Sequence, residues 1–464
     1  MDINQRIDAM RNEIIASTAE LVKIRSLEGE AKPGMPFGED VDKALQCALK
    51  MSEKLGFKTV NVDGYAGYAE IGEGEEYVAS LGHLDLVPEG DGWMYPPYAA
   101  EIHDGKMYGR GTSDDKGPVV ACLYALKAIK DSNLPMSKRI RVIFGTNEET
   151  GGEDIPYYLK KEKAPVLAFT PDADFPIING EKGITIFDLV KNFVPCDKEG
   201  KVIIESIVGG NAANMVPDYC EAVLTCANAE EVKNTVEAFA KDKKYEMTVN
   251  IEGNKAIIKS IGVSGHGSTP EQGKNAIMQL VTCLATLDLR DDEVSDYVKF
   301  FDEKVGMEVD GKSFGVYLED EPSGTLSFNL GKINLNRKSG STTLNLRYPV
   351  TKTLDDMMTP LCTTLGTTGI MMENFSHQEP LYFETDHPLI QKLAKAYSEQ
   401  MDEEAKFVSI GGGTYAKEMP NTVAFGPTFI GQPSTVHQPN EYIDIEELIR
   451  ISKIYAHALY ELAK

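Results

Sequence analysis

The sequence lacks several features that mark whole classes of protein. It has no apolar run long enough to cross a bilayer, and its first residues contain no apolar core of the kind that a signal peptide needs. It also has no internal repeat and no low-complexity segment. We therefore expect a globular protein of the cytoplasm that has no membrane partner.

Positive charge is scarce. The chain has 47 Lys and Arg residues against 72 Asp and Glu residues, a net charge of −25, and no basic run offsets this locally. Such a field repels phosphate backbones and anionic lipid surfaces, so we expect no nucleic-acid partner. The acidity suits metal capture, although most of these carboxylates must be solvated surface groups.

Paired cysteines are also missing. The 7 cysteines are odd in number, are scattered along the chain, and never form a C-x-x-C pair. In a chain of this size they indicate reduced, mostly buried thiols in a reducing cytoplasm. They are Cys47, Cys122, Cys196, Cys220, Cys226, Cys283 and Cys362.

What the sequence does contain begins with alternating helices and strands. At 464 residues the chain exceeds the size of one hydrophobic core, so we expect at least two domains. Apolar spacing predicts a helix over 7–24 and another over 118–129, and short apolar runs predict strands over 77–81, 139–144 and 165–169. Strands separated by helices predict an α/β fold with a largely parallel sheet and flanking helices.

The predicted secondary structure changes after the first third of the chain. Over 177–379 strand-like runs dominate, with a few helical segments between them, as in an inserted α+β domain. From residue 380 the α/β character returns, and Asp444 with Glu447 predicts the capped start of a C-terminal helix. We therefore predict one α/β domain formed by 1–176 and 380–464, interrupted by an α+β domain.

Metal-capable side chains follow several of the predicted strands. Because strand ends meet at one edge of an open α/β sheet, side chains distant in sequence can converge there. Imidazole and carboxylate ligands together suit zinc, manganese or cobalt. The candidates are His83, Asp85, Glu148, Glu149, Asp172 and His437.

Another acidic pair, Asp114-Asp115, stands in a glycine-rich stretch just before the helix predicted over 118–129. A carboxylate that bridges two ions allows a metal–metal separation of about 3.5–4 Å. Taken singly, however, a His at a strand end is more often structural, and an Asp pair is more often a helix cap or surface group. Spacing alone therefore indicates a hydrolase or a metal site and leaves the choice open.

Several longer motifs make the pattern more specific. Together they resemble the PepV-type dipeptidases of the aminoacylase/acetylornithine deacetylase superfamily of co-catalytic metallopeptidases, and the resemblance covers nearly the whole chain. The motifs are GHLDLVP at 82–88, YGRGTSDDKG at 108–117, GTNEET at 145–150, PDA at 171–173, SGHGSTP at 264–270, GGGTY at 411–415, and His437 with Asn440 and Glu441.

The resemblance implies two divalent metal ions per chain, with zinc expected first and manganese or cobalt as alternatives. It implies that His83 and Asp172 hold one ion and that Glu149 and His437 hold the other. Asp114 would bridge the two. No metal position of the family pattern is changed in this sequence.

The implied reaction is hydrolysis of the amide bond of dipeptides or very short peptides by a hydroxide held on the two metals. Glu148 would be the general base. Asp85 would orient His83 through the other nitrogen of its ring. The resemblance also implies a non-proline cis peptide bond after Asp114.

The insertion at 177–379 resembles a two-part lid whose extra half replaces a partner subunit. We therefore expect a monomer, with a homodimer as the alternative. In this interpretation His266 stabilises the oxyanion that develops during the reaction. Without the resemblance, His266 would be interpreted as a turn histidine.

The remaining implied residues bind the substrate. Arg347 would bind the C-terminal carboxylate of the peptide with two hydrogen bonds. Without the resemblance it would be interpreted as part of a surface salt bridge. Asn214, Gly412 and Gly413 would contact the rest of the substrate.

Three alternatives stay open. The same metal site could serve an N-acyl amino acid deacylase of the acetylornithine or succinyl-diaminopimelate type, and the long lid favours dipeptides over these. A non-catalytic metal-binding or scaffold protein is disfavoured because it would need no general base such as Glu148. A mononuclear enzyme differs from the dinuclear one in the number of metal ions it binds.

Overall fold

The computed structural model describes residues 2–366 and 368–464. The chain divides into two compact units, which are described here one at a time. The first unit contains Met1–Gly180, Phe383–Val408 and Gly413–Lys464, and the second contains Glu181–Tyr382 and Ser409–Gly412. Assigning catalysis to one unit and a lid function to the other stays a prediction.

The first unit is built on a mixed sheet with the strand order β1-β2-β6-β3-β7-β22-β9. The pairs β6–β3, β3–β7 and β7–β22 are parallel, and the flanking pairs are antiparallel. The predicted α/β class is confirmed, with its parallel pairing confined to the centre of the sheet. The strands are β1 (Lys58–Val62), β2 (Ala66–Ile71), β3 (Tyr77–His83), β6 (Arg139–Gly145), β7 (Leu167–Thr170), β9 (Ile177–Glu181) and β22 (Thr422–Ala424).

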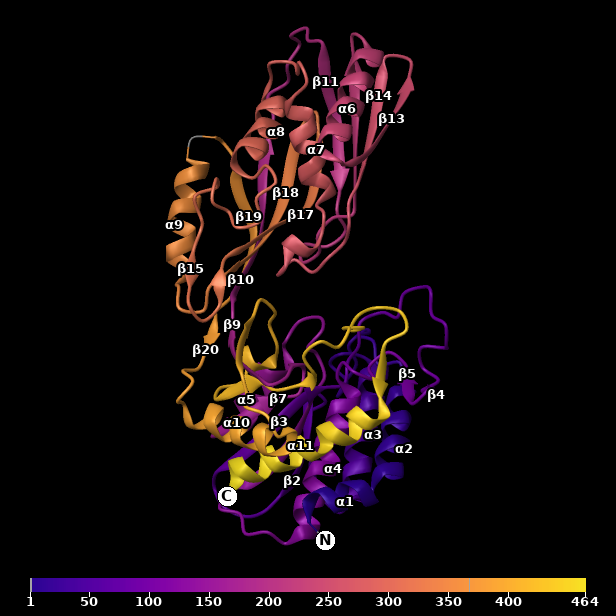
Figure 1. The fold of residues 1–464 in the computed structure, drawn as a ribbon, viewed down its shortest axis with the longest axis vertical. Helices are drawn as coiled ribbons and strands as arrows, with labels where there is room; N and C mark the ends of the chain where they lie inside the picture. Colours follow the sequence, from indigo (N-terminus) through magenta and orange to yellow (C-terminus); the bar gives the residue numbers. More distant parts are fainter. Residues whose placement is uncertain (1, 367) are drawn as a thin grey trace. The chain divides into compact units, whose positions relative to one another are not determined.

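Helices flank this sheet. Helix α4 packs against α11 and β3, and Figure 1 shows α10 beside α11. Because α4 is covered on several sides, it is apolar nearly all round. The helices are α1 (Ile3–Ala9), α2 (Arg11–Val22), α3 (Glu39–Lys54), α4 (Lys116–Ser132), α5 (Asp154–Lys161), α10 (Pro388–Met401) and α11 (Ile445–Ala463).

Two predictions about helix ends have different outcomes. The Asp444 side chain accepts hydrogen bonds from the backbone N–H groups of Glu446 and Glu447, so the predicted cap of α11 is confirmed. The single helix predicted over 7–24 is wrong, because Met10, with φ −92° and ψ 6°, separates α1 from α2. Ile7 and Ile14, one in each helix, are both fully buried. The apolar spacing therefore continues across the break and does not reveal it.

Strand alternation decides which face of the sheet carries the end of β3. Val78 packs in the larger core with the long helices, whereas Leu81 packs in the smaller core with Tyr158 of α5 and Tyr415. Side chains two apart share a face, so His83 lies on the same face as Leu81. Its ring meets the ring of Tyr415 edge-on, with centroids 6.3 Å apart.

The second unit contains an antiparallel sheet with the order β13-β14-β12-β11-β17-β18-β10-β19. The strand-rich character predicted for this region is therefore confirmed. Its main elements are β10 (Gly183–Asn192), β11 (Val202–Gly209), β12 (Tyr219–Cys226), α6 (Ala229–Lys243), β13 (Glu246–Glu252), β14 (Lys255–Ile261), α7 (Ala276–Ala285), α8 (Glu293–Lys304), β17 (Ser327–Asn336), β18 (Ser339–Tyr348), α9 (Leu354–Leu365) and β19 (Met371–Gln378).

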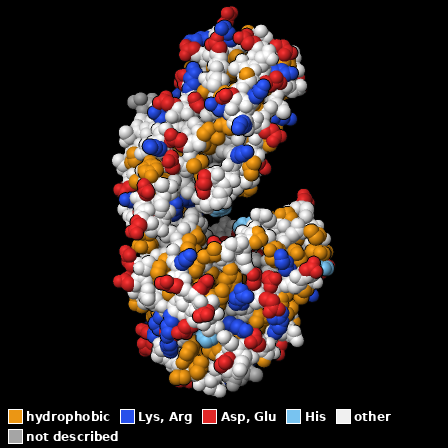
Figure 2. Space-filling model, viewed as in Figure 1, with side chains coloured by type: hydrophobic (Ala, Val, Ile, Leu, Met, Phe, Trp, Pro, Cys, Tyr) orange, Lys and Arg blue, Asp and Glu red, His pale blue; other side chains and the backbone are white. Residues whose placement is uncertain are grey.

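Short elements complete the two units. They are β4 (Glu101–His103), β5 (Lys106–Tyr108), β8 (Ala173–Asp174), the 3₁₀ helix η1 (Pro270–Gln272), β15 (Glu319–Asp320), β16 (Gly324–Thr325), β20 (Leu381–Tyr382), β21 (Phe407–Ile410), the 3₁₀ helix η2 (Tyr415–Lys417), β23 (Pro427–Thr428) and β24 (Tyr442–Asp444). None of the helices in the described part of the chain combines the length and the apolarity needed to span a bilayer. Figure 2 shows acidic, basic and hydrophobic side chains interspersed on the visible face of each unit.

Candidate active site

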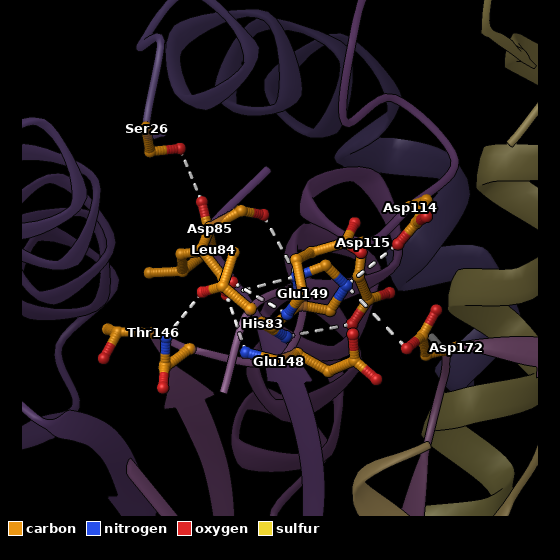
Figure 3. Close-up of polar contacts among 12 residues, drawn as sticks. Ser26, His83, Leu84, Asp85, Asp114, Asp115, Thr146, Glu148, Glu149 and Asp172 are labelled. Atoms are coloured by element: carbon orange, nitrogen blue, oxygen red, sulfur yellow. Dashed lines mark hydrogen bonds and ion pairs between the residues drawn. The ribbon is translucent and has the colours of Figure 1, made fainter. Parts of the chain in front are cut away.

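The metal-capable residues of the first unit converge beyond the carboxyl ends of its parallel strands. β3 ends at His83, Glu149 follows β6, and Asp172 follows β7. Asp114 lies just before α4, and His437 comes from the loop between β23 and β24. Figure 3 shows Asp114 and Asp172 directed toward the ring of His83.

The two carboxylate oxygens of Asp114 face different histidines. Oδ1 lies 2.8 Å from Nε2 of His83, and Oδ2 lies 2.9 Å from Nε2 of His437. Asp114 therefore lies between the two imidazole rings with one oxygen available to each side.

A second carboxylate accompanies each histidine. Asp172 Oδ2 lies 3.8 Å from His83 Nε2, and Glu149 Oε1 lies 3.0 Å from His437 Nε2. Each histidine, its own carboxylate and Asp114 offer ligand atoms that all lie within 4.8 Å of one another. These two donor sets share Asp114, and a third group of possible ligands within the same distance consists of His83, Glu148 and Glu149.

Burial and neighbouring charges shift the pKa values of these groups. Burial would lower the pKa of His83, but hydrogen bonds to Asp114 and Asp85 outweigh it and raise the pKa well above its usual value. Burial, together with the nearby charge of Asp114, raises the pKa of Glu149 and raises that of Asp172 strongly. For Asp114 the hydrogen bonds from His437 and His83 prevail over burial and lower the pKa.

This arrangement fits divalent metal ions. Asp114, Glu149 and Asp172 lie close together with side chains that are at most 16% exposed, where unpaired negative charge is costly. Cations at the two donor sets would neutralise it. Imidazole and carboxylate donors without thiolates are the ligand types of zinc, manganese and cobalt sites.

Asp85 supports both His83 and the loop after β6. His83 Nδ1 lies 3.1 Å from the backbone carbonyl oxygen of Asp85 and 3.4 Å from its carboxylate. That carboxylate accepts hydrogen bonds from the backbone N–H groups of Glu148 (3.2 Å) and Glu149 (3.0 Å). Metal-bound histidines usually have a carboxylate or a backbone carbonyl at the second ring nitrogen, which fixes the orientation of the ring.

Glu441 supports the segment that presents Asp114, although the sequence assigned it no role. Its side chain is fully buried, and Oε1 accepts hydrogen bonds from the backbone N–H groups of Gly111 (3.0 Å), Ser113 (2.9 Å) and Asp114 (3.2 Å). Oε2 pairs with the guanidinium of Arg110 at 2.7 Å. The only sequence signal for this role is that Glu441 belongs to one of the motifs. The peptide bond after Asp114 is cis, as expected.

The residues predicted to contact substrate lie in the second unit, except Gly413, which is exposed in the first. His266 is exposed, and its Nδ1 accepts a hydrogen bond from the backbone N–H of Ser268 at 3.3 Å. Asn214 is exposed, and Gly412 is half-buried. Their positions relative to substrate stay predictions.

Arg347 is buried, with 5% of its surface exposed. It donates hydrogen bonds from Nε to the Asn345 side chain (3.0 Å) and from a terminal nitrogen to the Gly411 carbonyl oxygen (2.9 Å). Among the described residues no carboxylate pairs with it, and burial alone lowers its pKa to about 10. It is a buried cation rather than half of a surface salt bridge.

Comparison with known proteins identifies the family. Residues 79–461 match the model of peptidase family M20/M25/M40. The chain belongs to this family. This peptidase is therefore a hydrolase of a metallopeptidase family, whose members use divalent metal ions.

Three proteins that match this chain over nearly its full length are described as dipeptidases. The chain is 40% identical over 470 residues to a Bacillus subtilis protein named "Putative dipeptidase YtjP", with 100% of both chains covered. Among solved structures, human carnosine dipeptidase 1 gives a TM-score of 0.60 at 16% identity, covering 99% of this chain and 98% of that one. The Saccharomyces cerevisiae di-peptidase Dug1p gives 0.59 at 14% identity, covering 99% and 98%. At these identities the two structures establish the fold.

Proposed function

We propose that this peptidase is a dipeptidase that hydrolyses the amide bond of dipeptides or very short peptides with two divalent metal ions. The observation that carries the proposal is Asp114, whose two oxygens face His83 and His437 at 2.8 and 2.9 Å. A carboxylate shared in this way suits a pair of ions. The description of the B. subtilis relative as a dipeptidase supports the substrate class.

The ligand roles follow from the two donor sets. His83 and Asp172 would hold one ion, Glu149 and His437 would hold the other, and Asp114 would serve both. When bound, the ions polarise the substrate carbonyl and make a water molecule more acidic. Zinc is the expected metal, with manganese or cobalt as alternatives.

Glu148 is assigned the proton transfers. It is the neighbour of Glu149, and its carboxylate comes within 4.8 Å of the ligand atoms of His83 and Glu149. It therefore stands beside the metal ligands without being needed to complete either donor set. From this position it takes a proton from the attacking water and delivers it to the leaving amine.

Arg347 is assigned the C-terminal carboxylate of the substrate. Its guanidinium is buried and has no carboxylate partner among the described residues, which is costly unless a ligand supplies the negative charge. A planar guanidinium binds a carboxylate through two parallel hydrogen bonds. A substrate with a free carboxylate is thereby preferred over its amide.

His266 is assigned the developing oxyanion. Its Nδ1 lies 3.3 Å from the backbone nitrogen of Ser268 and 2.5 Å from the Ser268 hydroxyl oxygen. With Nδ1 as the acceptor, the proton of the neutral ring would be on Nε2. A donor at Nε2 is what oxyanion stabilisation requires. Asn214, Gly412 and Gly413 are proposed to contact the remainder of the substrate.

The test combines metal analysis with a substrate panel. The chelated protein should be inactive and regain activity with Zn²⁺, Mn²⁺ or Co²⁺, at two ions per chain. It should cleave alanyl-alanine faster than alanyl-alaninamide, N-acetylornithine or N-succinyl-diaminopimelate. Saturation at one ion would contradict the dinuclear site, and a preference for either N-acyl substrate would make the chain a deacylase.

A further inference from the structure

The loop that carries Glu148, between β6 and α5, is held by hydrogen bonds to two buried carboxylates, those of Asp85 and Asp154. Its backbone N–H groups at Glu148 and Glu149 donate to Asp85, as described above. The two preceding N–H groups, of Thr146 and Asn147, donate to Oδ2 of Asp154 at 2.6 and 3.1 Å. Four consecutive N–H groups are thus bound by side chains that the metal donor sets do not use.

Asp154 is in turn fixed by Tyr415, which comes from a distant part of the chain. Both side chains are buried, and the Tyr415 hydroxyl donates a hydrogen bond to Asp154 Oδ2. The same hydroxyl oxygen accepts from the N–H of Asn147 at 3.4 Å. A Cβ at Gly145 would come within 2.2 Å of this hydroxyl, so the end of β6 accommodates the tyrosine only because residue 145 is glycine.

We propose that Asp154 and Tyr415 are positioning residues for the Glu148 carboxylate. Neither belongs to the donor sets around His83 and His437. They act through the backbone of residues 146 and 147, whose orientation sets where the next side chain points. The inference rests on the proposed role of Glu148 as general base.

The physical argument concerns the loop itself. Residues 146–153 connect β6 to α5 without regular structure, so the strand ladder does not fix this backbone. Hydrogen bonds to a buried, ionised acceptor are stronger than those to water or neutral groups. Removing the Tyr415 hydroxyl leaves Asp154 with one donor fewer in a buried place, and the loop can shift to compensate. A shift of about 1 Å at a catalytic group can cost about a hundredfold in rate.

The first test is Tyr415→Phe, which keeps the ring and removes the hydroxyl. Its matched control is Tyr158→Phe on α5, because the Tyr158 hydroxyl is equally buried but bonds to Arg141 and Tyr77 instead of the loop. At saturating metal we expect kcat for alanyl-alanine to fall about ten- to a hundredfold in Tyr415→Phe with little change in KM. We expect the control to keep its kcat even if its melting temperature falls.

The second test asks whether the effect passes through Glu148. In a Glu148→Gln background the further change Tyr415→Phe should lower the residual kcat by less than twofold, since no base remains to be positioned. An equal loss in both backgrounds would overturn the inference. Asp154→Asn, which keeps the shape but not the charge, should show the same dependence on Glu148.

The third test needs no activity. In the metal-free protein, amide hydrogen exchange of Thr146 and Asn147 should be faster in Tyr415→Phe than in wild type and unchanged in Tyr158→Phe. If Tyr415→Phe changes neither the exchange nor kcat while Glu148→Gln strongly lowers kcat, this inference alone is overturned. Normal turnover in Glu148→Gln would instead overturn the base assignment and this inference with it.

Discussion

Glu148 and Glu149 are neighbours in the chain with different expected tasks. Glu149 faces His437 at 3.0 Å as a metal ligand, whereas Glu148 is assigned to proton transfer. Glu148→Gln keeps size and polarity but removes the base. We expect kcat to fall by about 10²–10⁴ with two metal ions per chain still bound, as measured by steady-state kinetics beside elemental analysis.

The control for this prediction is Glu153→Gln, five positions along the same loop. Glu153 is exposed, so this change should leave kcat near the wild-type value. Near-normal turnover in Glu148→Gln would show that the base is elsewhere. Loss of one metal ion in that variant would show that Glu148 is a ligand.

A pH prediction follows from Asp154. Burial raises its pKa to about 6 from its usual value of 3.8. Between these two pH values Asp154 is protonated in the folded state and ionised in the unfolded state. Its contribution to the free energy of unfolding is therefore fully present below pH 3.8 and is lost as pH rises through about 6. Asp85, Glu418 and Tyr415 are the ionisable groups around it.

The measurement is urea unfolding of the metal-free wild type and of Asp154→Asn from about pH 4 to about pH 7. Because the variant cannot ionise here, the wild-type free energy of unfolding should fall relative to it by about 2–3 kcal/mol. A constant difference across this range would show that burial does not shift the pKa of Asp154.

The sequence pattern predicted some of the site residues and gave no indication of others. His83, Glu149 and Asp172 stand at or shortly after the ends of β3, β6 and β7, and a short apolar run in the sequence predicts where such a strand ends. Asp154 had no such signal, because its role depends on a tyrosine 261 positions away. A local sequence pattern cannot predict a hydrogen bond between two residues that meet only in the folded chain.

Among the elements, the segment before α4 depends most on a distant partner. Glu441 accepts three of its backbone N–H groups and pairs with Arg110, with both side chains buried. Glu441→Gln removes the charge and leaves the guanidinium of Arg110 unpaired. We expect a loss of roughly 3–5 kcal/mol in unfolding free energy and about 10–100-fold weaker metal binding.

The control is Glu446→Gln, which breaks the ion pair of Glu446 with Arg11. The Glu446 side chain is 72% exposed, and surface pairs of this kind contribute about 0–1 kcal/mol. Calorimetry and metal titration of both variants compare the two pairs. Equal, small effects would mean that Glu441 does not hold the Asp114 segment.

Element prediction succeeded where a segment is apolar and buried along nearly its whole length. β3, β6 and α4 lie close to their predicted positions. The antiparallel strands β1 and β2 at the edge of the first sheet were not predicted. In β1 only Val62 of the five residues is buried, so its alternation is too faint to indicate a strand.

For the whole molecule, the open question is whether one chain holds a complete active site. The metal donor sets lie in the first unit, and His266 lies in the second. We predict that His266 acts within its own chain, because the second unit, Glu181–Tyr382 with Ser409–Gly412, carries an antiparallel sheet with helices of its own and is long enough to replace a partner subunit.

The test mixes two variants that are each inactive, His266→Ala and Glu148→Gln. If a site borrows His266 from a neighbouring chain, mixed dimers contain some sites with both residues, and activity returns on mixing. If His266 acts in its own chain, every site lacks one of the two groups and the mixture stays inactive. We expect no rescue at any mixing ratio. His266→Ala alone should bind two metal ions per chain while losing most of its turnover, since it removes an oxyanion donor and no ligand.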